Sequence, residues 1–510
     1  MSASAAPAKV HQLVSAFVDA PDDRLDAEFR QLTGALWGDG AATDLALPAA
    51  QELAGRFETL DDRRRGYAAV LLGLLVETEY PATDGPLATA VGTGLDAYAD
   101  LAGGLDQGDP LFLALCYLLA HFPAARERVL AAARQAGLHE DDYSRLDRAL
   151  ATLDPEHPVL GRVFPSPAAW QRYGAEGDFD KRWIEAMSPE EVVRGWRADT
   201  GTAFAGLGAK AYWAVRNWTS PAVPAEIDFP PDEKIARAGE PAVNLFDAHE
   251  PALRCPACGG AFEVAERRAR CTQCDTAYPI SAGILDLTKT MAGDEADDFD
   301  FMVAETPGMT LFYERIARPN FLRLCGSNWD DAVTTGIEDD YLARHVRPVE
   351  GPVLDLGCGA GRWTGVLADT VGAERVLALD ATGPMLSMLR ARLAGVPAIR
   401  SGAAPLPFKD ASLGAVLCWN ALQAFPDPPA AVAEVGRCLR PGGTFTVMTF
   451  RNSDDPVYRH FVAAHTPAEY RVGPRPFDPD ALKQLLADAG LRIREEWGPG
   501  TFVFFTAERA

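Results

Sequence analysis

The sequence predicts a multidomain protein with an α-helical N-terminal domain, a small four-cysteine ribbon and a C-terminal α/β domain of Rossmann-like fold. Three observations support this prediction. Apolar residues recur at spacings of three and four in the first half, two Cys-x-x-Cys pairs lie near the middle, and an apolar run near residue 353 leads into a glycine-rich turn. A length of 510 residues fits about three domains of ordinary size.

The first domain is expected over residues 1–235, where the spacing of apolar residues is helical, as in the run from Tyr67 to Leu75. The stretch from Leu111 to Leu153 predicts two or three short helices, with breaks at Phe122-Pro123 and Gly137-Leu138. This pattern resembles HEAT-like helical repeats. Because no fixed repeat period is visible, a generic helical bundle remains the alternative.

The second domain is expected over residues 250–290, which contain Cys255, Cys258, Cys271 and Cys274. Each Cys-x-x-Cys pair can bind a metal ion from a tight turn, and two such pairs predict a tetrahedral zinc site. Four thiolates leave no position for water, so the zinc is expected to be structural rather than catalytic. The segment resembles a zinc ribbon.

The third domain is expected over residues 300–510 and begins its α/β pattern with a strand that ends in a glycine-rich turn. The segment Val353 to Gly361 reads Val-Leu-Asp-Leu-Gly-Cys-Gly-Ala-Gly, and Asp380 ends the next apolar run. Glycines let the backbone approach a ligand that a Cβ would exclude, and an acid at the end of the second strand can bind both ribose hydroxyls. A dinucleotide turn would need Gly or Ala where the chain has Arg362, so the pattern argues against a dinucleotide.

These residues resemble the first motif of class I S-adenosylmethionine-dependent methyltransferases. The segment Tyr278–Leu287 resembles the tail that follows such zinc ribbons in bacterial methyltransferases of the ubiquinone/menaquinone type. Further segments match the family in the expected order: Leu406–Phe408, Val416–Asn420 and Arg440–Gly443. The resemblance implies S-adenosyl-L-methionine as cofactor. It also implies a set of cofactor-binding residues: Asp355, Gly357, Gly359, Gly361, Asp380, Ala403 and Asn420, with Tyr313 and Arg315 from the preceding helix.

Two positions depart from the family pattern. The chain has Ser401-Gly402-Ala403 where relatives place an acid for the adenine amine, and Gly414 where they have an aspartate before the fourth strand. For an acceptor that must lose a proton, the candidate catalytic bases are His460 and Tyr458, in the segment after the fifth strand. A histidine beside aromatic residues is also a common packing residue.

The charge of the chain is unevenly distributed. Residues 1–250 carry 39 acidic and 22 basic side chains, whereas residues 351–510 carry 16 of each. No region has the basic excess that nucleic-acid binding requires, so a nucleic-acid substrate is disfavoured. The acidic half predicts a solvated surface or a docking face for a protein partner.

Cysteine usage and hydropathy predict where the protein resides. The nine cysteines are sparse and odd in number, so a disulfide framework is not expected. No apolar run has membrane-spanning length, and the first residues lack a signal-type apolar core. A cytoplasmic protein is expected.

The predicted function is transfer of a methyl group to a small-molecule acceptor, expected to be a specialised metabolite. Two alternatives remain open from the sequence. One is an enzyme of the same fold that binds the cofactor but catalyses a cyclisation or displacement, which the two departures and the large N-terminal half would favour. The other is a non-catalytic interaction protein, in which Asp380 and the three glycines would have no reason to be present together.

Overall fold

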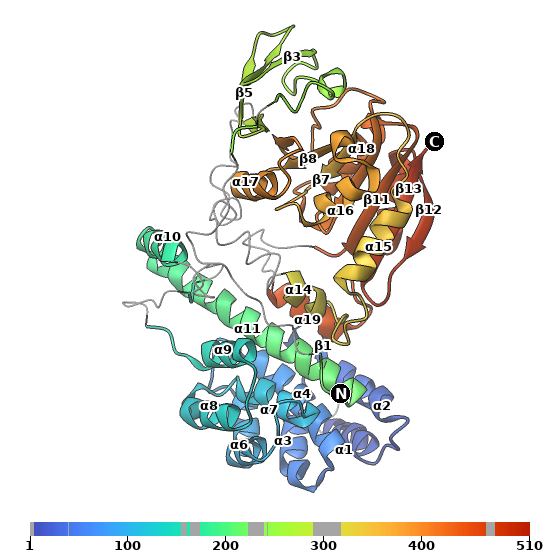
Figure 1. Cartoon of the computed structure of the whole chain (residues 1–510). Helices are drawn as coiled ribbons and strands as arrows, with labels where there is room; N and C mark the ends of the chain where they lie inside the picture. The colour runs from blue at the N-terminus through green and yellow to red at the C-terminus, as the bar shows by residue number, and fades with distance from the viewer. Residues whose placement is uncertain are drawn as a thin grey trace.

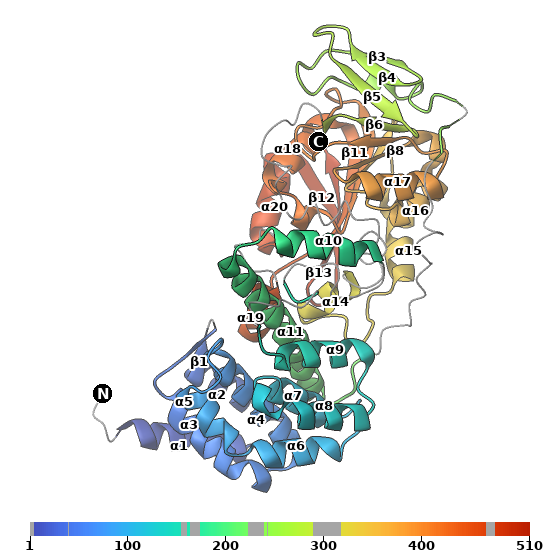
Figure 2. The ribbon, with the colours of Figure 1, turned by 90° about the vertical axis from the view of Figure 1, so that its left-hand side faces the viewer.

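The structure is a computed structural model that describes residues 5–38, 40–154, 161–163, 174–222, 239–241, 243–288, 318–465 and 475–510. It has a helical region and an α/β region, joined along the long helix α11 (Pro189–Asn217), as Figures 1 and 2 show. Of the described helices, none is long and apolar enough to cross a lipid bilayer.

The helical region is built around helices that are buried on nearly every side. Helix α4 (Asp62–Glu77) is capped by the side chain of Asp61 and is buried from Gly66 to Val76. Helix α7 (Pro110–Leu119) begins with Asp109 as cap and a proline in its first turn, and both features favour helix initiation. These two helices and α11 pack against one another. The other elements of this region are α1 (Ala5–Val18), α2 (Leu25–Leu36), β1 (Trp37–Gly38), β2 (Ala41–Ala42), α3 (Ala46–Arg56), α5 (Pro86–Gly92), α6 (Leu95–Gly103), α8 (Arg126–Gln135), α9 (Glu140–Leu150) and α10 (Gly174–Glu185).

The predicted helix breaks after residue 111 are confirmed. Helix α7 ends before Pro123, and α8 ends before Gly137, whose φ of 72° is in the left-handed region that favours glycine. His139 then caps α9. Local sequence signals were sufficient here because proline and glycine act on the backbone where they stand.

Strands of the ribbon and of the α/β region form one sheet. Among the described residues its order is β12-β13-β11-β10-β7-β8-β9-β6-β5-β4-β3. The ribbon supplies β3 (Phe262–Ala265), β4 (Arg268–Cys271), β5 (Ala277–Ser281) and β6 (Ile284–Asp286). The α/β region supplies β7 (Val353–Leu356), β8 (Val376–Asp380), β9 (Ala398–Arg400), β10 (Leu413–Trp419), β11 (Leu439–Phe450), β12 (Leu491–Trp497) and β13 (Phe502–Arg509).

The central five strands have the doubly wound arrangement. Strands β9, β8, β7, β10 and β11 are parallel, and the chain changes direction across the sheet between β7 and β10. Strands β13 and β12 then add in antiparallel pairing. The helices of this region are α14 (Arg318–Leu324), α15 (Thr335–His345), α16 (Arg362–Val371), α17 (Gly383–Arg392), α18 (Pro428–Cys438), α19 (Pro456–His465) and α20 (Pro479–Asp488).

Two segments cross the boundaries that the sequence predicts. Strand β6 of the ribbon pairs in parallel with β9, and residues of the ribbon and of the sheet share one apolar cluster. Helix α19 packs on α11, and three of its residues (Val457, Tyr458 and Phe461) lie in the apolar cluster of the helical region. The predicted domains are therefore not separate units. The interval 250–290 shares an apolar core with 300–510, and 300–510 shares another with 1–235.

Candidate cofactor site and metal site

The glycine-rich turn lies at the carboxyl end of β7, beside the point where the strand order reverses. All three glycines have positive φ: 74° at Gly357, 52° at Gly359 and 87° at Gly361. A Cβ at Gly357 would lie 2.5 Å from the Cβ of Ala421, and a Cβ at Gly361 would lie 2.9 Å from Leu389 Cγ. These two glycines therefore permit close packing of the turn against its own domain.

Gly359 differs from the other two because a Cβ there would meet no atom nearer than Met385 Sδ, at 4.0 Å. The turn thus leaves open space at its middle glycine. Ligands of doubly wound sheets bind beyond the carboxyl ends of the strands at such a reversal. The open approach at Gly359 fits a bound nucleoside cofactor.

Asp380 lies at the end of β8 and its carboxylate reaches the turn. The amide of Gly359 donates to Asp380 Oδ2 over 2.9 Å, and the amide and hydroxyl of Thr382 both donate to Oδ1 over 2.9 Å. An ionised carboxylate accepts about four hydrogen bonds, so this group keeps acceptor capacity for a ribose hydroxyl. Thr382 was not predicted from the sequence, although its position two residues after an acid at a strand end is typical of such local hydrogen bonds.

Asp355, which the resemblance implies as a cofactor residue, lies beneath the turn and is only 2% exposed. The hydroxyl of Thr364 donates to its Oδ2 over 2.6 Å. Burial raises the pKa of Asp355 to about 7, although the Thr364 hydrogen bond lowers it, and the negative charge of Asp380 raises it further. A direct contact of Asp355 with cofactor stays a prediction.

The raised pKa of Asp355 predicts a pH-dependent stability. Between its ordinary value of 3.8 and about 7 the folded protein keeps a proton that the unfolded chain has released, so this group stabilises the fold less as the pH rises through that window. Asp355→Asn removes the titration and can still accept from Thr364. We expect it to raise the melting temperature, relative to wild type, more at pH 8 than at pH 5, since one pKa unit corresponds to about 1.4 kcal/mol. Thermal melts at the two pH values test this, and an equal difference at both would contradict it.

Asn420 follows β10 at the same edge of the sheet and has a φ of 56°, an uncommon backbone conformation that asparagine tolerates. Its amide donates to the carbonyl of Met448, and its Oδ1 accepts from Gln423 Nε2 over 3.2 Å. Gln423 in turn accepts from Thr449 over 2.7 Å. These bonds connect the ends of β10 and β11.

The two departures from the family pattern, at residues 401–403 and at Gly414, lie in different structural surroundings. Ser401 and Ala403 follow β9, and the amide of Ser401 donates to the carbonyl of Asp380 over 3.0 Å, so this segment lies beside the acid. Gly414 lies within β10 rather than before it, and a Cβ there would be 2.4 Å from the carbonyl oxygen of Val349. The absence of an aspartate at Gly414 therefore follows from packing.

The candidate bases His460 and Tyr458 lie on α19, against the helical region. His460 Nε2 is 2.9 Å from Glu77 Oε1, and its ring packs against Trp37 with centroids 5.2 Å apart. Tyr458 is 5% exposed and packs against Tyr212. Burial would raise the pKa of Glu77, but hydrogen bonds from His121 and His460 lower it to about 2. The catalytic role of His460 and Tyr458 stays a prediction. Tyr313 and Arg315, which the resemblance implies as cofactor residues, lie outside the described residues.

The four cysteines of the ribbon converge. Their sulfur atoms all lie within 4.8 Å of one another, with 3.8 Å between Cys255 and Cys274 and 3.4 Å between Cys258 and Cys271. A tetrahedral ion with Zn–S bonds of about 2.3 Å separates its sulfurs by about 3.8 Å, so the arrangement fits zinc. Gly260 is needed because a Cβ there would lie 2.9 Å from Cys271 Sγ.

The two cysteine turns also have matching backbone geometry. The amide of Gly259 donates to the carbonyl of Cys255, and the amide of Asp275 donates to that of Cys271. Both donors have positive φ, of 75° and 65°. The amides of Gln273 and Cys274 point at Cys271 Sγ, at 3.4 and 3.5 Å, as amides do around a metal-bound thiolate.

The strand order, the open glycine turn and Asp380 are those of a doubly wound α/β domain with a site that fits a nucleoside cofactor. Residues 353–443 match the family described as methyltransferase domain. Residues 353–443 are thus a methyltransferase domain, which supports an S-adenosylmethionine-dependent methyltransferase activity for the chain.

Two proteins of similar sequence are also named methyltransferases. The chain is 27% identical over 257 residues to an uncharacterized chloroplastic methyltransferase of Arabidopsis thaliana, covering 47% of this chain and 70% of that protein. It is 31% identical over 147 residues to the trans-aconitate 2-methyltransferase of Acidovorax sp. (strain JS42), covering 26% and 54%. The geranyl diphosphate C-methyltransferase of Streptomyces coelicolor A3(2), solved with S-adenosyl-L-homocysteine, is 14% identical with a TM-score of 0.30, covering 34% of this chain and 76% of that chain.

Proposed function

We propose that the chain transfers the methyl group of S-adenosylmethionine to a small-molecule acceptor. The observation that carries this proposal is the open turn at Gly359 with Asp380 hydrogen-bonded to it, at the reversal point of the sheet. When bound, the cofactor supplies a methyl group on a positively charged sulfur, which a nucleophile displaces in line. Proximity and alignment can provide about 7–11 kcal/mol of such a barrier, so positioning is the main task of the protein.

The residues of the chain have distinct tasks in this proposal. Asp380 accepts from a ribose hydroxyl, and Gly359 allows the backbone to approach the cofactor. Ala403 lines the side next to β9, and Asn420 holds the ends of β10 and β11 together beside the acceptor. For an acceptor that loses a proton, His460 or Tyr458 would need to leave its present partners, so their contacts with Glu77 and Tyr212 favour a packing role.

We also propose that Cys255, Cys258, Cys271 and Cys274 hold one structural zinc ion. Convergence of the four sulfurs and the amides that point at Cys271 support this. The zinc ribbon ahead of the glycine turn supports the ubiquinone/menaquinone-type resemblance. Free cysteines throughout the described chain support a reducing compartment, which we propose is the cytoplasm.

The assay for the proposed function uses methyl-labelled S-adenosylmethionine with a panel of small carboxylates, amines, phenols and prenyl diphosphates that includes trans-aconitate. A product that gains one methyl group supports the proposal, and an unmethylated product of changed structure would favour a cyclisation or displacement. Calorimetry with S-adenosyl-L-homocysteine tests the cofactor site directly. No binding at millimolar concentration would overturn the proposal and leave the interaction-protein alternative.

The acidic helical half is a candidate docking face for a protein partner, and nucleic acid stays disfavoured by the charge distribution.

A further inference from the structure

Helix α19 links the cofactor edge of the sheet to the helical region. It begins at Pro456, shortly after β11 ends at Phe450. Strand β11 is parallel to β10, with Met448 opposite Trp419, so its carboxyl end lies beside Asn420 and at the same edge as the glycine turn. An acceptor must lie beside the cofactor at this edge. Residues after β11 are therefore placed to bound the acceptor space.

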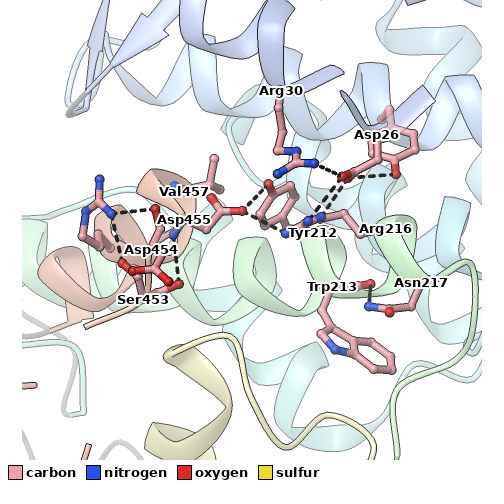
Figure 3. A network of polar contacts seen from close by, with 12 residues as sticks. Asp26, Arg30, Tyr212, Trp213, Arg216, Asn217, Ser453, Asp454, Asp455 and Val457 are labelled. Atoms are coloured by element: carbon pink, nitrogen blue, oxygen red, sulfur yellow. Dashed lines mark hydrogen bonds and ion pairs between the residues drawn. The ribbon is translucent and has the colours of Figure 1, made fainter. Parts of the chain in front are cut away.

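The start of α19 is held by a network of charges that spans three helices (Figure 3). Asp455 accepts from the amide of Val457 with Oδ1, and from Tyr212 and Arg216 with Oδ2 over 2.8 and 2.9 Å. Arg216 also binds both oxygens of Asp26, over 2.8 and 3.3 Å. Asp26 belongs to α2 and Arg216 to α11, so the network fixes residue 455 relative to the helical core.

The middle of α19 packs against α11 at a glycine that leaves space for an aromatic ring. A Cβ at Gly208 would lie 2.4 Å from Cε1 of Phe461, a residue that is fully buried. The ring of Phe461 also packs against Tyr117, with centroids 5.8 Å apart. Glycine costs helix stability relative to alanine, so its presence within a long buried helix fits a position where the ring needs the space. A second glycine, Gly326, leaves space for Tyr458, because a Cβ at Gly326 would lie 2.6 Å from Cδ2 of Tyr458.

We propose that the helical region sets the position of α19 and thereby shapes the acceptor side of the methyltransferase site, with Gly208 and Asp455 as positioning residues. This inference rests on the proposed function for the identity of the cofactor. In this proposal the helical region acts on the acceptor side of the site through α19. Changes at either residue should alter acceptor binding and leave cofactor binding in place, because the glycine turn follows β7 and Asp380 ends β8, away from α19 in the sequence.

The test compares Gly208→Ala with Gly201→Ala on the same helix. Both exchanges gain the same helix propensity, but a Cβ at Gly201 would meet only the carbonyl oxygen of Ala464, at an ordinary 3.7 Å. Asp455→Asn is the second variant, because overpacking at Gly208 can unfold part of the chain. Its control is Asp454→Asn, since Asp454 is exposed and Arg459 donates to its backbone carbonyl, which the exchange retains.

Three quantities are measured on the full-length chain: amide hydrogen exchange in residues 453–465, the Kd of S-adenosyl-L-homocysteine, and the KM of the panel acceptor that the wild type methylates. For Gly208→Ala and Asp455→Asn we expect exchange to rise about tenfold and acceptor KM to rise about fivefold or more, with the cofactor-product Kd changed less than about twofold. Both controls should match wild type.

Unchanged exchange in 453–465, or a loss of S-adenosyl-L-homocysteine affinity as large as the loss of acceptor affinity, would overturn this inference. A failure of the proposed function gives a different result, because the wild-type protein itself would then bind no S-adenosyl-L-homocysteine. The exchange measurement decides the positioning of α19 in that case as well.

Discussion

Asp380→Ala is expected to weaken binding of S-adenosyl-L-homocysteine by about 100-fold or more. In the proposed site this carboxylate accepts from a ribose hydroxyl, and hydrogen bonds to a charged group contribute about 1.5–3 kcal/mol each. Its loss also frees the amide of Gly359, which now donates to Asp380 Oδ2. Isothermal calorimetry measures the change, and methyl transfer should fall with it.

The matched control for this variant is Asp369→Ala. Asp369 is an exposed aspartate on α16, the helix that follows the glycine turn, so the exchange removes the same charge nearby. Its Kd should stay within about twofold of wild type, since an exposed charge is largely screened by solvent. Equal losses in both variants would mean that net charge, rather than a contact at the ribose, governs binding.

Cys255→Ser is expected to abolish zinc binding and to unfold the ribbon. Wild-type protein should carry one zinc per chain, and structural zinc contributes about 10–16 kcal/mol of binding free energy that is also folding free energy. Because Cys255 is buried against the sheet and β6 pairs with β9, the melting temperature of the α/β region should fall as well. Metal analysis and thermal melts of the purified chain measure both effects.

Cys116→Ala is the control, because Cys116 is a free, buried thiol of α7 in the helical region. It should retain one zinc per chain. Wild-type protein that contains no zinc after purification without chelators would refute the metal site. Retention of zinc in Cys255→Ser would show that the other three cysteines suffice.

The parts of the structure that the sequence predicted are those that local signals determine. Gly357, Gly359 and Gly361 have positive φ as a tight turn requires, and Asp380 ends its strand as expected. The cysteine spacing placed four sulfurs within reach of one ion. In each case the residues that specify the feature lie within a few positions of one another, or in adjacent parallel strands whose ends must meet.

Other features depend on contacts between distant segments and could not be predicted. His460 meets Glu77 across 383 positions of sequence, and Gly208 meets Phe461. The pairing of β6 with β9 likewise has no local signature. The periodicity of a helix shows that one of its faces is buried, but not which element covers that face. The sequence therefore favoured packing for His460 without showing that Glu77 is its partner.

The joining of the ribbon to the sheet also changes where the sheet ends. Without the ribbon, the short strand β9 would present unpaired backbone groups, and exposed strand edges are sites of intermolecular pairing and aggregation. The outermost strands are instead β3, which carries Glu263, and β12, which reads Leu-Arg-Ile-Arg-Glu-Glu-Trp. Charged side chains on both edges oppose the addition of strands from other molecules, so the ribbon protects this large sheet against self-association.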